Sequence, residues 1–207
     1  MKNKLLIIGA SGHGKVIADI ALKMNKWQSI AFLDDEKNIK SSMGLQVIGT
    51  SDDVFTHINE HEIFVGIGNN DTRQKILEIL ESLGASLPVL IHPNAVIGLQ
   101  VDFGIGTVVM AGAVINSCTK IGKGCIVNTG STIDHDNNIE DFVHISPGAH
   151  LAGAVKVGKG SWLGVGSVVS NNISITKGCK IGAGSVVLKD IYEPGVYVGT
   201  PAKKLGY

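Results

Sequence analysis

The 207-residue sequence lacks an excess of charge of either sign, because its 18 lysine and arginine residues match its 18 acidic residues. Without a basic surface the protein is not expected to bind nucleic acid, and without an acidic tract it has no solvating arm. No apolar run reaches membrane-spanning length, and the aliphatic run at residues 5–8 is too short for a signal peptide. We therefore expect a cytoplasmic protein with neither a membrane nor a nucleic-acid partner.

Cysteine and aromatic residues are also scarce. The three cysteines, Cys118, Cys125 and Cys179, are odd in number and lack metal-ligand spacing, so we expect them to fill space in a reducing compartment. Aromatic residues make up only 5% of the chain, whereas glycine occurs 27 times. This composition is typical of a core built from thin aliphatic layers with glycine at the corners.

A repeat of six residues dominates the second half of the chain. Four residues after each repeated apolar position the side chain is usually small or β-branched, and Asn137 and Ile173 depart from this rule. A period of six fits neither a helix nor an alternating strand, but it is typical of a solenoid. The apolar positions are Ile91, Ile97, Phe103, Val109, Ile115, Ile121, Val127, Ile133, Ile139, Ile145, Leu151, Val157, Leu163, Val169, Ile175, Ile181 and Val187.

Such a repeat predicts a three-sided coil. Three hexads would close one coil of about eighteen residues, and successive coils would stack at the strand spacing of roughly 4.8 Å. The apolar residues would then form one continuous core, in which each buried aliphatic side chain contributes about 1.5–3 kcal/mol. Glycines recur where the corners would need a positive φ, as in residues 121–124, 157–160 and 181–184.

Before the repeat, short aliphatic runs alternate with helical patterns. Strands are predicted at residues 5–8, 30–33, 47–48 and 63–67, with helices after the glycine turn at 9–14, from an N-cap at Ser51 to about Glu60, and up to Gly84. This alternation predicts a small parallel sheet of the Rossmann type, with a ligand beyond the carboxyl ends of its strands. The N–H groups that open the first helix suit phosphate.

The glycine turn at residues 9–14 is not the dinucleotide fingerprint, because Ser11 stands where that pattern needs glycine. Asp34 nevertheless follows Gly14 by twenty residues, which is the distance of a ribose-binding acid. A nicotinamide cofactor is therefore one alternative, which the half-size domain disfavours. A turn without any ligand is another.

The repeat resembles the hexapeptide-repeat acyltransferases, and the left hand of their parallel β-helix is implied by that resemblance alone. The motifs GASGHG (9–14), FLDD (32–35), IGNN (67–70), DHD (134–136) and VGTPAKKL (198–205) extend the similarity to the sugar acetyltransferases of this family over the whole chain. The resemblance implies a Rossmann-like α/β domain at residues 1–88, which binds a nucleotide sugar. An all-β left-handed parallel β-helix would follow at residues 89–207, in a homotrimer.

The resemblance also implies a reaction. It points to transfer of the acetyl group of acetyl-CoA, without a metal, to the amine of a nucleotide-linked 4-amino-deoxy sugar, with UDP as the favoured nucleotide. Such a step belongs to bacterial glycan biosynthesis. O-acetylation of a sialic acid is an alternative, and a non-catalytic subunit that binds a sugar nucleotide is an alternative of another class.

Acetyl transfer to an amine needs a general base, and histidine, with a pKa of about 6.5, suits neutral pH. His135 stands between Asp134 and Asp136, and a neighbouring carboxylate favours the protonated imidazole and so strengthens it as a base. By resemblance His135 is the catalytic base and Asp136 raises its basicity, while Asp134 is an alternative partner. The spacing of His135, His144 and His150 places them on different faces of one chain, which disfavours a zinc site.

The remaining site residues are implied by resemblance, and for each the alternative is an ordinary corner or loop residue. Arg73 either pairs with phosphate or is solvated, and Lys203 and Lys204 either meet the CoA phosphates or form a solvated tail. His144 is expected near the acetyl group. Backbone groups along the pantetheine arm are expected at Gly153, Gly164, Val165, Gly182 and Ala183. The nucleotide-sugar acceptor is expected at Gly12, His13, Gly14, Asp34, Asp35, Gly68 and Asn69.

Overall fold

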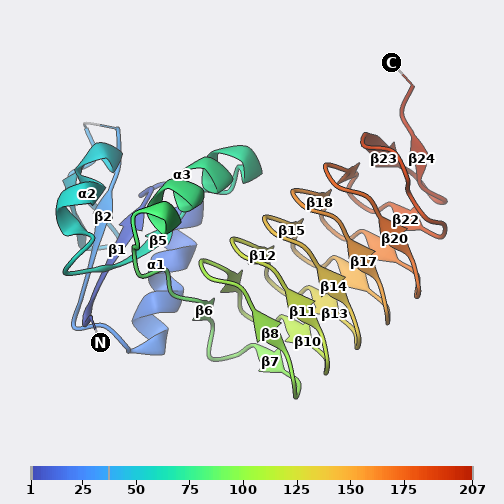
Figure 1. Ribbon diagram of the computed structural model, residues 1–207, viewed down its shortest axis with the longest axis horizontal. Helices are drawn as coiled ribbons and strands as arrows, with labels where there is room; N and C mark the ends of the chain where they lie inside the picture. Colours follow the sequence, from blue (N-terminus) through green and yellow to red (C-terminus); the bar gives the residue numbers. More distant parts are fainter. Residues whose placement is uncertain (1, 37, 207) are drawn as a thin grey trace. The chain divides into compact units, whose positions relative to one another are not determined.

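The computed structural model describes residues 2–36 and 38–206. The chain divides into two compact units, Met1–Pro93 and Asn94–Tyr207 (Figure 1). The first is an α/β unit and the second is an all-β solenoid of short parallel strands. The predicted fold classes are therefore confirmed. No helix in the described part of the chain is long and apolar enough to cross a membrane.

The first unit is built on a sheet with the strand order β3-β4-β2-β1-β5. Neighbouring strands are parallel except for the β3–β4 hairpin, which the sequence did not predict. Helix α1 connects β1 to β2 and α3 follows β5. The elements are β1 (Lys4–Ile8), α1 (Gly12–Met24), β2 (Ser29–Leu33), β3 (Ser41–Ser42), β4 (Leu45–Gly49), β5 (Glu62–Val65), α3 (Asn70–Ser82) and β6 (Leu90–Ile91).

The helix expected from Ser51 to Glu60 is shorter and has a different cap. Thr50 is its N-cap and forms a capping box with Asp53, and the 3₁₀ turn η1 (Ser51–Asp53) continues into α2 (Val54–His57). The prediction of Ser51 as the N-cap was wrong, because the turn begins at the preceding threonine, whose N–H and hydroxyl both donate to Oδ2 of Asp53. The hydroxyl of Ser51 instead donates to Asp35.

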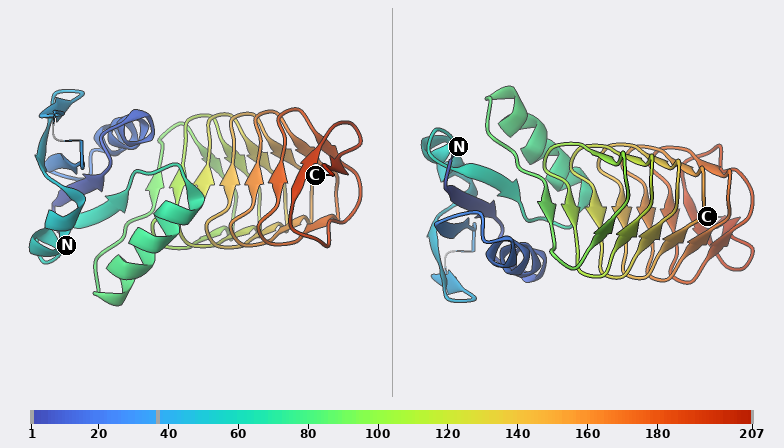
Figure 2. Two further views of the ribbon diagram at one scale, coloured as in Figure 1. Left: turned by 90° about the horizontal axis from the view of Figure 1, so that it is seen from above. Right: turned by 90° about the horizontal axis from the view of Figure 1, so that it is seen from below.

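The second unit contains three faces of two-residue strands, and the coils lie one beside the next along one axis (Figure 2). Each strand from β7 to β22 ends at a predicted apolar position. The β13 face holds β7 (Val96–Ile97), β10 (Val114–Ile115), β13 (Thr132–Ile133), β16 (His150–Leu151), β19 (Val168–Val169) and β22 (Val186–Val187). The β14 face holds β8 (Asp102–Phe103), β11 (Lys120–Ile121), β14 (Asn138–Ile139), β17 (Lys156–Val157) and β20 (Ser174–Ile175). The β15 face includes β9 (Val108–Val109), β12 (Ile126–Val127), β15 (His144–Ile145), β18 (Trp162–Leu163), β21 (Lys180–Ile181), β23 (Val196–Val198) and β24 (Lys203–Lys204).

The strand register confirms the predicted length of the coil. Ile115 pairs with Ile133 and Ile133 with Leu151, so each residue lies beside the residue eighteen positions away. The repeated apolar side chains from Ile115 to Val187 are at most 3% exposed. The core is therefore one continuous aliphatic stack.

Polar side chains four residues after the apolar position join successive coils. Thr107 Oγ1 donates to the carbonyl of Gly122 at 2.8 Å, and Thr119 Oγ1 donates to the carbonyl of Asp134 at 2.9 Å. We call this bond, from one corner to the carbonyl fifteen residues on, the corner bond. It satisfies a buried hydroxyl and a buried carbonyl together.

From the corner after Ile97 to the corner after Ile181, the residue three positions after the apolar one has a positive φ. Glycine holds most of these places, whereas Cys118 and Asp136 adopt the left-handed conformation at φ of 63° and 59°. Cys125 and Cys179 are buried as expected, but Cys118 is exposed at its corner. The prediction of Cys118 as filler was wrong, because its side chain is exposed at this corner.

Candidate active site

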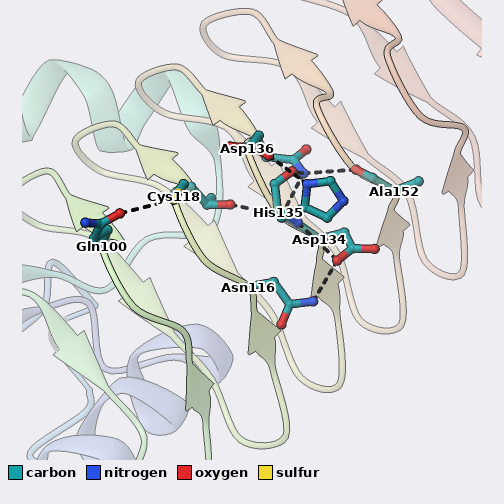
Figure 3. A network of polar contacts seen from close by, with 9 residues as sticks. Gln100, Asn116, Cys118, Asp134, His135, Asp136 and Ala152 are labelled. Carbon is teal, nitrogen blue, oxygen red and sulfur yellow. Dashed lines mark hydrogen bonds and ion pairs between the residues drawn. The ribbon is translucent and has the colours of Figure 1, made fainter.

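His135 and Asp136 form a pair at the corner between β13 and β14. Nδ1 of His135 lies 2.7 Å from Oδ2 of Asp136, and both side chains are 61% exposed (Figure 3). The hydrogen bond from the imidazole to Asp136 raises the pKa of His135, and the charges of Asp134 and Asp136 add to this effect. The geometry thus supplies a histidine of increased basicity.

Asp134 has a different part in this corner. Its Oδ1 accepts a hydrogen bond from Nδ2 of Asn116 at 2.7 Å and another from the backbone N–H of His135 at 3.1 Å. These two donors hold the pKa of Asp134 below its ordinary value. Of the two carboxylates, Asp136 therefore contacts the imidazole, and Asp134 holds the backbone of the corner.

The contact with Asp136 determines which ring nitrogen of His135 is available as a base. When Nδ1–H donates to the carboxylate, Nε2 carries the lone pair in the neutral ring. This edge of the ring lies against Gly153, where a Cβ would come within 2.7 Å of Cε1 and Nε2. In other coils the equivalent position, at multiples of eighteen residues from Gly153, is occupied by a residue with a side chain: Leu99, Ser117 or Asn171. Glycine at position 153 therefore leaves room for the base.

His144 lies on the β15 face and is held by two neighbours that the sequence analysis missed. Its ring stacks on Trp162, with centroids 5.4 Å apart and planes 2° from parallel. Nδ2 of Asn128 lies 3.1 Å from its Nε2. Trp162 is fixed in turn, because its Nε1 donates to Oγ of Ser146 at 2.7 Å. The interval of eighteen residues between His144 and Trp162 is the signal that would have revealed the stack.

Two of the glycine corners expected to hold the cofactor, Gly164 and Gly182, lie in successive coils directly after strands of the β15 face. The N–H of Gly164 donates to the carbonyl of Ile181, and the N–H of Gly182 donates to the carbonyl of Tyr197, both at 2.8 Å. These two N–H groups are engaged within the β-helix, so a cofactor here must contact other atoms. Val165, which follows Gly164, is 56% exposed. Ala183 occupies the matching place in the next coil.

Two further features of the β-helix bear on the predicted ligands. Lys204, expected at the CoA phosphates or in a solvated tail, forms an ion pair with Glu193 at 2.7 Å. Within the described residues, no group of three or more His, Cys, Asp or Glu side chains is arranged to hold a metal ion.

The predicted catalytic and cofactor residues form two separate groups in one chain. His135, Asp136 and Gly153 share the edge where the β13 and β14 faces meet. His144 lies on the β15 face, and Gly164 and Gly182 directly follow its strands. Of the expected cofactor residues, Gly153 therefore lies beside the base, whereas His144, Gly164 and Gly182 lie on or directly after the β15 face of the same chain.

In the first unit, a cavity of about 260 Å³ lies at the carboxyl ends of β1 and β2 and beside α3. Of the residues expected at the acceptor, Asp34 and Asp35 line it, whereas Gly12, His13, Gly14, Gly68 and Asn69 are not among its lining residues. Sequence reasoning did not assign Ser11, Ser51 or Thr72 to the ligand, although Ser11 lies within the glycine turn itself. The cavity is lined by Ile8, Gly9, Ser11, Leu33, Asp34, Asp35, Ser51, Ile67, Thr72 and Ile76.

Both aspartates of this cavity also bind the chain's own loops. Oδ2 of Asp34 accepts from the N–H of Ala10 at 2.6 Å, and its Oδ1 accepts from the N–H of Glu36 at 2.9 Å. Oδ1 of Asp35 accepts from the N–H and the hydroxyl of Ser51, at 2.8 and 2.7 Å. The two carboxylates therefore shape the cavity as well as line it.

The glycine turn places His13 in the first turn of α1. A Cβ at Gly14 would lie 1.8 Å from the carbonyl oxygen of Gly9, so only glycine fits there. Nε2 of His13 is buried and has no hydrogen-bond partner in the part of the chain that the structure describes. Burial, followed by the charge of Arg73, lowers the pKa of His13 to about 4. His13 is therefore neutral at pH 7.

Arg73 is buried and binds the chain itself, whereas the sequence suggested either a phosphate partner or a solvated side chain. It is 1% exposed and donates to the carbonyls of Ile67 at 3.2 Å and Gly68 at 2.9 Å. It also donates to Oδ1 of Asn70 at 2.8 Å. Asn69, expected at the acceptor, caps α3 by accepting from the N–H of Thr72 at 3.0 Å. The loop before α3 is thus fixed by the chain itself.

Comparisons with known proteins agree with both units. The PglD N-terminal domain matches residues 4–80. UDP-N-acetylbacillosamine N-acetyltransferase of Bacillus subtilis (strain 168) is 36% identical over 116 residues, which span 54% of this chain and 52% of that protein.

Two solved structures are similar over nearly the whole chain. The acetyltransferase domain of PglB from Neisseria gonorrhoeae FA1090, in complex with acetyl coenzyme A, has a TM-score of 0.96 at 41% identity, covering 99% of this chain and 100% of that one. PerB from Caulobacter crescentus, in complex with CoA and GDP-perosamine, has a TM-score of 0.92 at 35% identity, covering 98% of this chain and 97% of that one. This chain therefore belongs to the hexapeptide-repeat sugar acetyltransferases that carry the PglD N-terminal domain, and it is an acetyltransferase.

Proposed function

We propose that the protein transfers the acetyl group of acetyl-CoA to the amine of a UDP-linked 4-amino-deoxy sugar. The observation that carries this proposal is the 2.7 Å contact between His135 and Asp136, which leaves Nε2 of the ring as the base. The supporting relatives are the enzyme named for UDP-N-acetylbacillosamine, PerB in its complex with CoA and GDP-perosamine, and the PglB domain in its complex with acetyl coenzyme A.

The reaction needs few groups from the protein. As the sugar nitrogen attacks the thioester carbonyl, Nε2 of His135 accepts its proton, a C–N bond forms and the C–S bond breaks. Asp136 stabilises the imidazolium, which then returns the proton to the departing CoA sulfur. The exposed cysteine of this region, Cys118, donates to Gln100 at 3.3 Å instead of contacting the imidazole. We therefore infer direct attack without an acyl-enzyme.

We further propose that the working enzyme is a homotrimer in which His135 of one subunit acts beside His144 of the next. The separation of the two groups on one chain supports this arrangement. The test is to mix His135→Ala with His144→Ala subunits after partial denaturation. In an equal mixture, a shared site is intact only where a subunit that retains His135 meets a neighbour that retains His144. This holds for about one subunit interface in four, so shared sites should recover about a quarter of the wild-type activity. No recovery, with mixed trimers verified by mass, would contradict shared sites.

The nucleotide and the acceptor atom are tested by one panel. Free thiol is measured with acetyl-CoA and UDP-, GDP- or dTDP-linked 4-amino sugars, and with a sialic acid. We expect a higher kcat/KM with the nucleotide-linked amines than with sialic acid, because the HGK turn (13–15) and the FLDD pair suit a nucleoside diphosphate. Among the nucleotides we expect UDP to be preferred, as the relative named for UDP-N-acetylbacillosamine suggests. A preference for GDP would move the assignment to guanine, and acetylation of sialic acid would favour an oxygen acceptor. Binding without thiol release across the panel would favour a non-catalytic subunit.

A further inference from the structure

Asn137, which directly follows Asp136, departs from the pattern of the repeat. It occupies the place where most other corners carry a small or β-branched side chain, and it is only 1% exposed. Its Nδ2 donates to the carbonyls of Asp134 at 2.8 Å, His135 at 3.2 Å and Ala152 at 2.9 Å. Because all three neighbours are acceptors, the orientation of the amide is determined.

One of these contacts is the ordinary corner bond of the fold. The bond to Ala152 spans fifteen residues, like the bonds made by Thr107 and Thr119. The other two contacts are additional. They go to the carbonyl of Asp134, which precedes His135, and to the carbonyl of His135 itself. Threonine, with one hydroxyl hydrogen, cannot make the corner bond and these contacts together.

The amide is also costly at this position. Oδ1 of Asn137 is buried and finds no hydrogen-bond partner among the described residues. An unsatisfied buried acceptor costs about 1–3 kcal/mol, and a threonine would avoid that cost while keeping the corner bond. The extra contacts at Asp134 and His135 are what the asparagine adds in return.

These contacts connect the two backbone segments that enclose the imidazole. One segment carries His135 itself. The other contains Ala152, which directly precedes Gly153, the residue that the ring lies against (Figure 3 shows Ala152 beside His135). The N–H of Ala154 also donates to the carbonyl of His135 at 2.9 Å, so both segments are held at this point.

We propose that Asn137 is a positioning residue, whose amide fixes the imidazole of His135 relative to the backbone at Gly153. This role rests on the proposed function of His135 as the base. It acts through His135 and does not require Asn137 to touch either substrate. A displacement of about 1 Å in a catalytic group costs on the order of 10²-fold in rate, so a small shift of this corner is sufficient.

The test compares Asn137→Thr with Thr107→Val in the assembled enzyme. Asn137→Thr keeps the corner bond and removes the two extra contacts, whereas Thr107→Val removes a corner bond distant from His135 along the stack. We expect kcat of Asn137→Thr to fall about 10–100-fold, with both KM values within about twofold of wild type. Thr107→Val should lower the melting temperature and leave kcat unchanged.

Histidine NMR supplies a second readout that is independent of activity. If the corner relaxes in Asn137→Thr, the contact with Asp136 loosens and the titration midpoint of His135 moves to lower pH, while Thr107→Val leaves it in place. A wild-type kcat and titration in Asn137→Thr, or equal losses in both variants, would overturn the proposal. Asn137→Ser serves in the same comparison should Asn137→Thr fail to fold. Full activity of His135→Ala would instead refute the proposed base, and the NMR comparison would still test the positioning.

Discussion

Nδ1 of His135 and Oδ2 of Asp136 lie 2.7 Å apart although the two residues are adjacent in the sequence. In an extended strand adjacent side chains point to opposite faces. Here the left-handed conformation of Asp136, at φ of 59°, turns its carboxylate back to the preceding ring. Since both groups are exposed, the pair tunes the basicity of His135 and adds little to the stability of the fold.

Asp136→Asn should therefore move the acid limb of kcat/KM to lower pH. A general base works when deprotonated, so activity falls as the pH drops through its pKa, and the raised pKa of His135 moves this limb to higher pH than an unperturbed histidine would give. Without the carboxylate the pKa falls and the ring becomes a weaker base, so the plateau rate should fall about tenfold or more. The measurement is kcat/KM from pH 5 to 9.

The matched control is Asp134→Asn, because that carboxylate lies in the same corner and contacts the backbone instead of the ring. Its acid limb should move less than that of Asp136→Asn. Equal displacements in the two variants would mean that total charge, and not the contact with Nδ1, determines the basicity of His135.

The fold was predictable because a single property, apolarity at every sixth position, determines the core. Ile133 is buried for the reason that Ile115 and Leu151 are buried, and no detailed contact needs to be known. The coil length also carries information about sites, because residues eighteen apart become neighbours. His144 with Trp162 and His135 with Gly153 both have this spacing, so the environment of each histidine was accessible from the sequence.

The loops of the first unit were less predictable. Asp34 and Asp35 lie at the cavity because they follow the end of a strand. Their hydrogen bonds to Ala10 and Ser51 depend on loop conformations, which no repeating pattern in the sequence predicts. The sequence suggested for Arg73 only a solvated side chain or a phosphate partner, whereas its guanidinium is buried and donates to the carbonyls of Ile67 and Gly68 and to the side chain of Asn70. Asn137 was visible only as an irregularity in the repeat.

Gly153→Ala should lower kcat on the order of 10²-fold, because an added Cβ would displace the ring of His135. Asn171→Ala is the control, since it changes the corresponding corner of the following coil. Steady-state kinetics and a melting curve for each variant separate the effects on rate and stability. A Gly153→Ala enzyme with wild-type kcat would show that the ring tolerates another position.

His13 should make the protein less stable as the pH falls from about 6.5 to about 4. Its pKa is about 4 in the folded state and about 6.5 when unfolded, so in this interval the unfolded chain binds more protons. The stability that the neutral ring contributes is complete above pH 6.5 and is lost toward pH 4, with a maximum of about 3 kcal/mol.

Urea unfolding of His13→Gln at pH 4.5 and 7.5 tests this expectation. The difference in free energy of unfolding between the two pH values should be smaller in the variant than in wild type. His57→Gln, a change of another histidine in the same unit, serves as the control. An unchanged pH dependence in His13→Gln would show that burial of this ring does not limit acid stability.

Trp162 should report on the cofactor, because it stacks on His144 and is 45% exposed. An aromatic stack contributes about 0.5–1.5 kcal/mol, so Trp162→Leu should raise KM for acetyl-CoA about 2–10-fold, and Trp162→Phe should raise it less. The chain's other tryptophan, Trp27, is only 8% exposed, so quenching of the emission by CoA should come from Trp162 and should be absent in Trp162→Phe. Quenching that persists in this variant, or an unchanged KM in Trp162→Leu, would place the cofactor away from the β15 face and remove the reason for pairing His144 with a neighbouring subunit's His135.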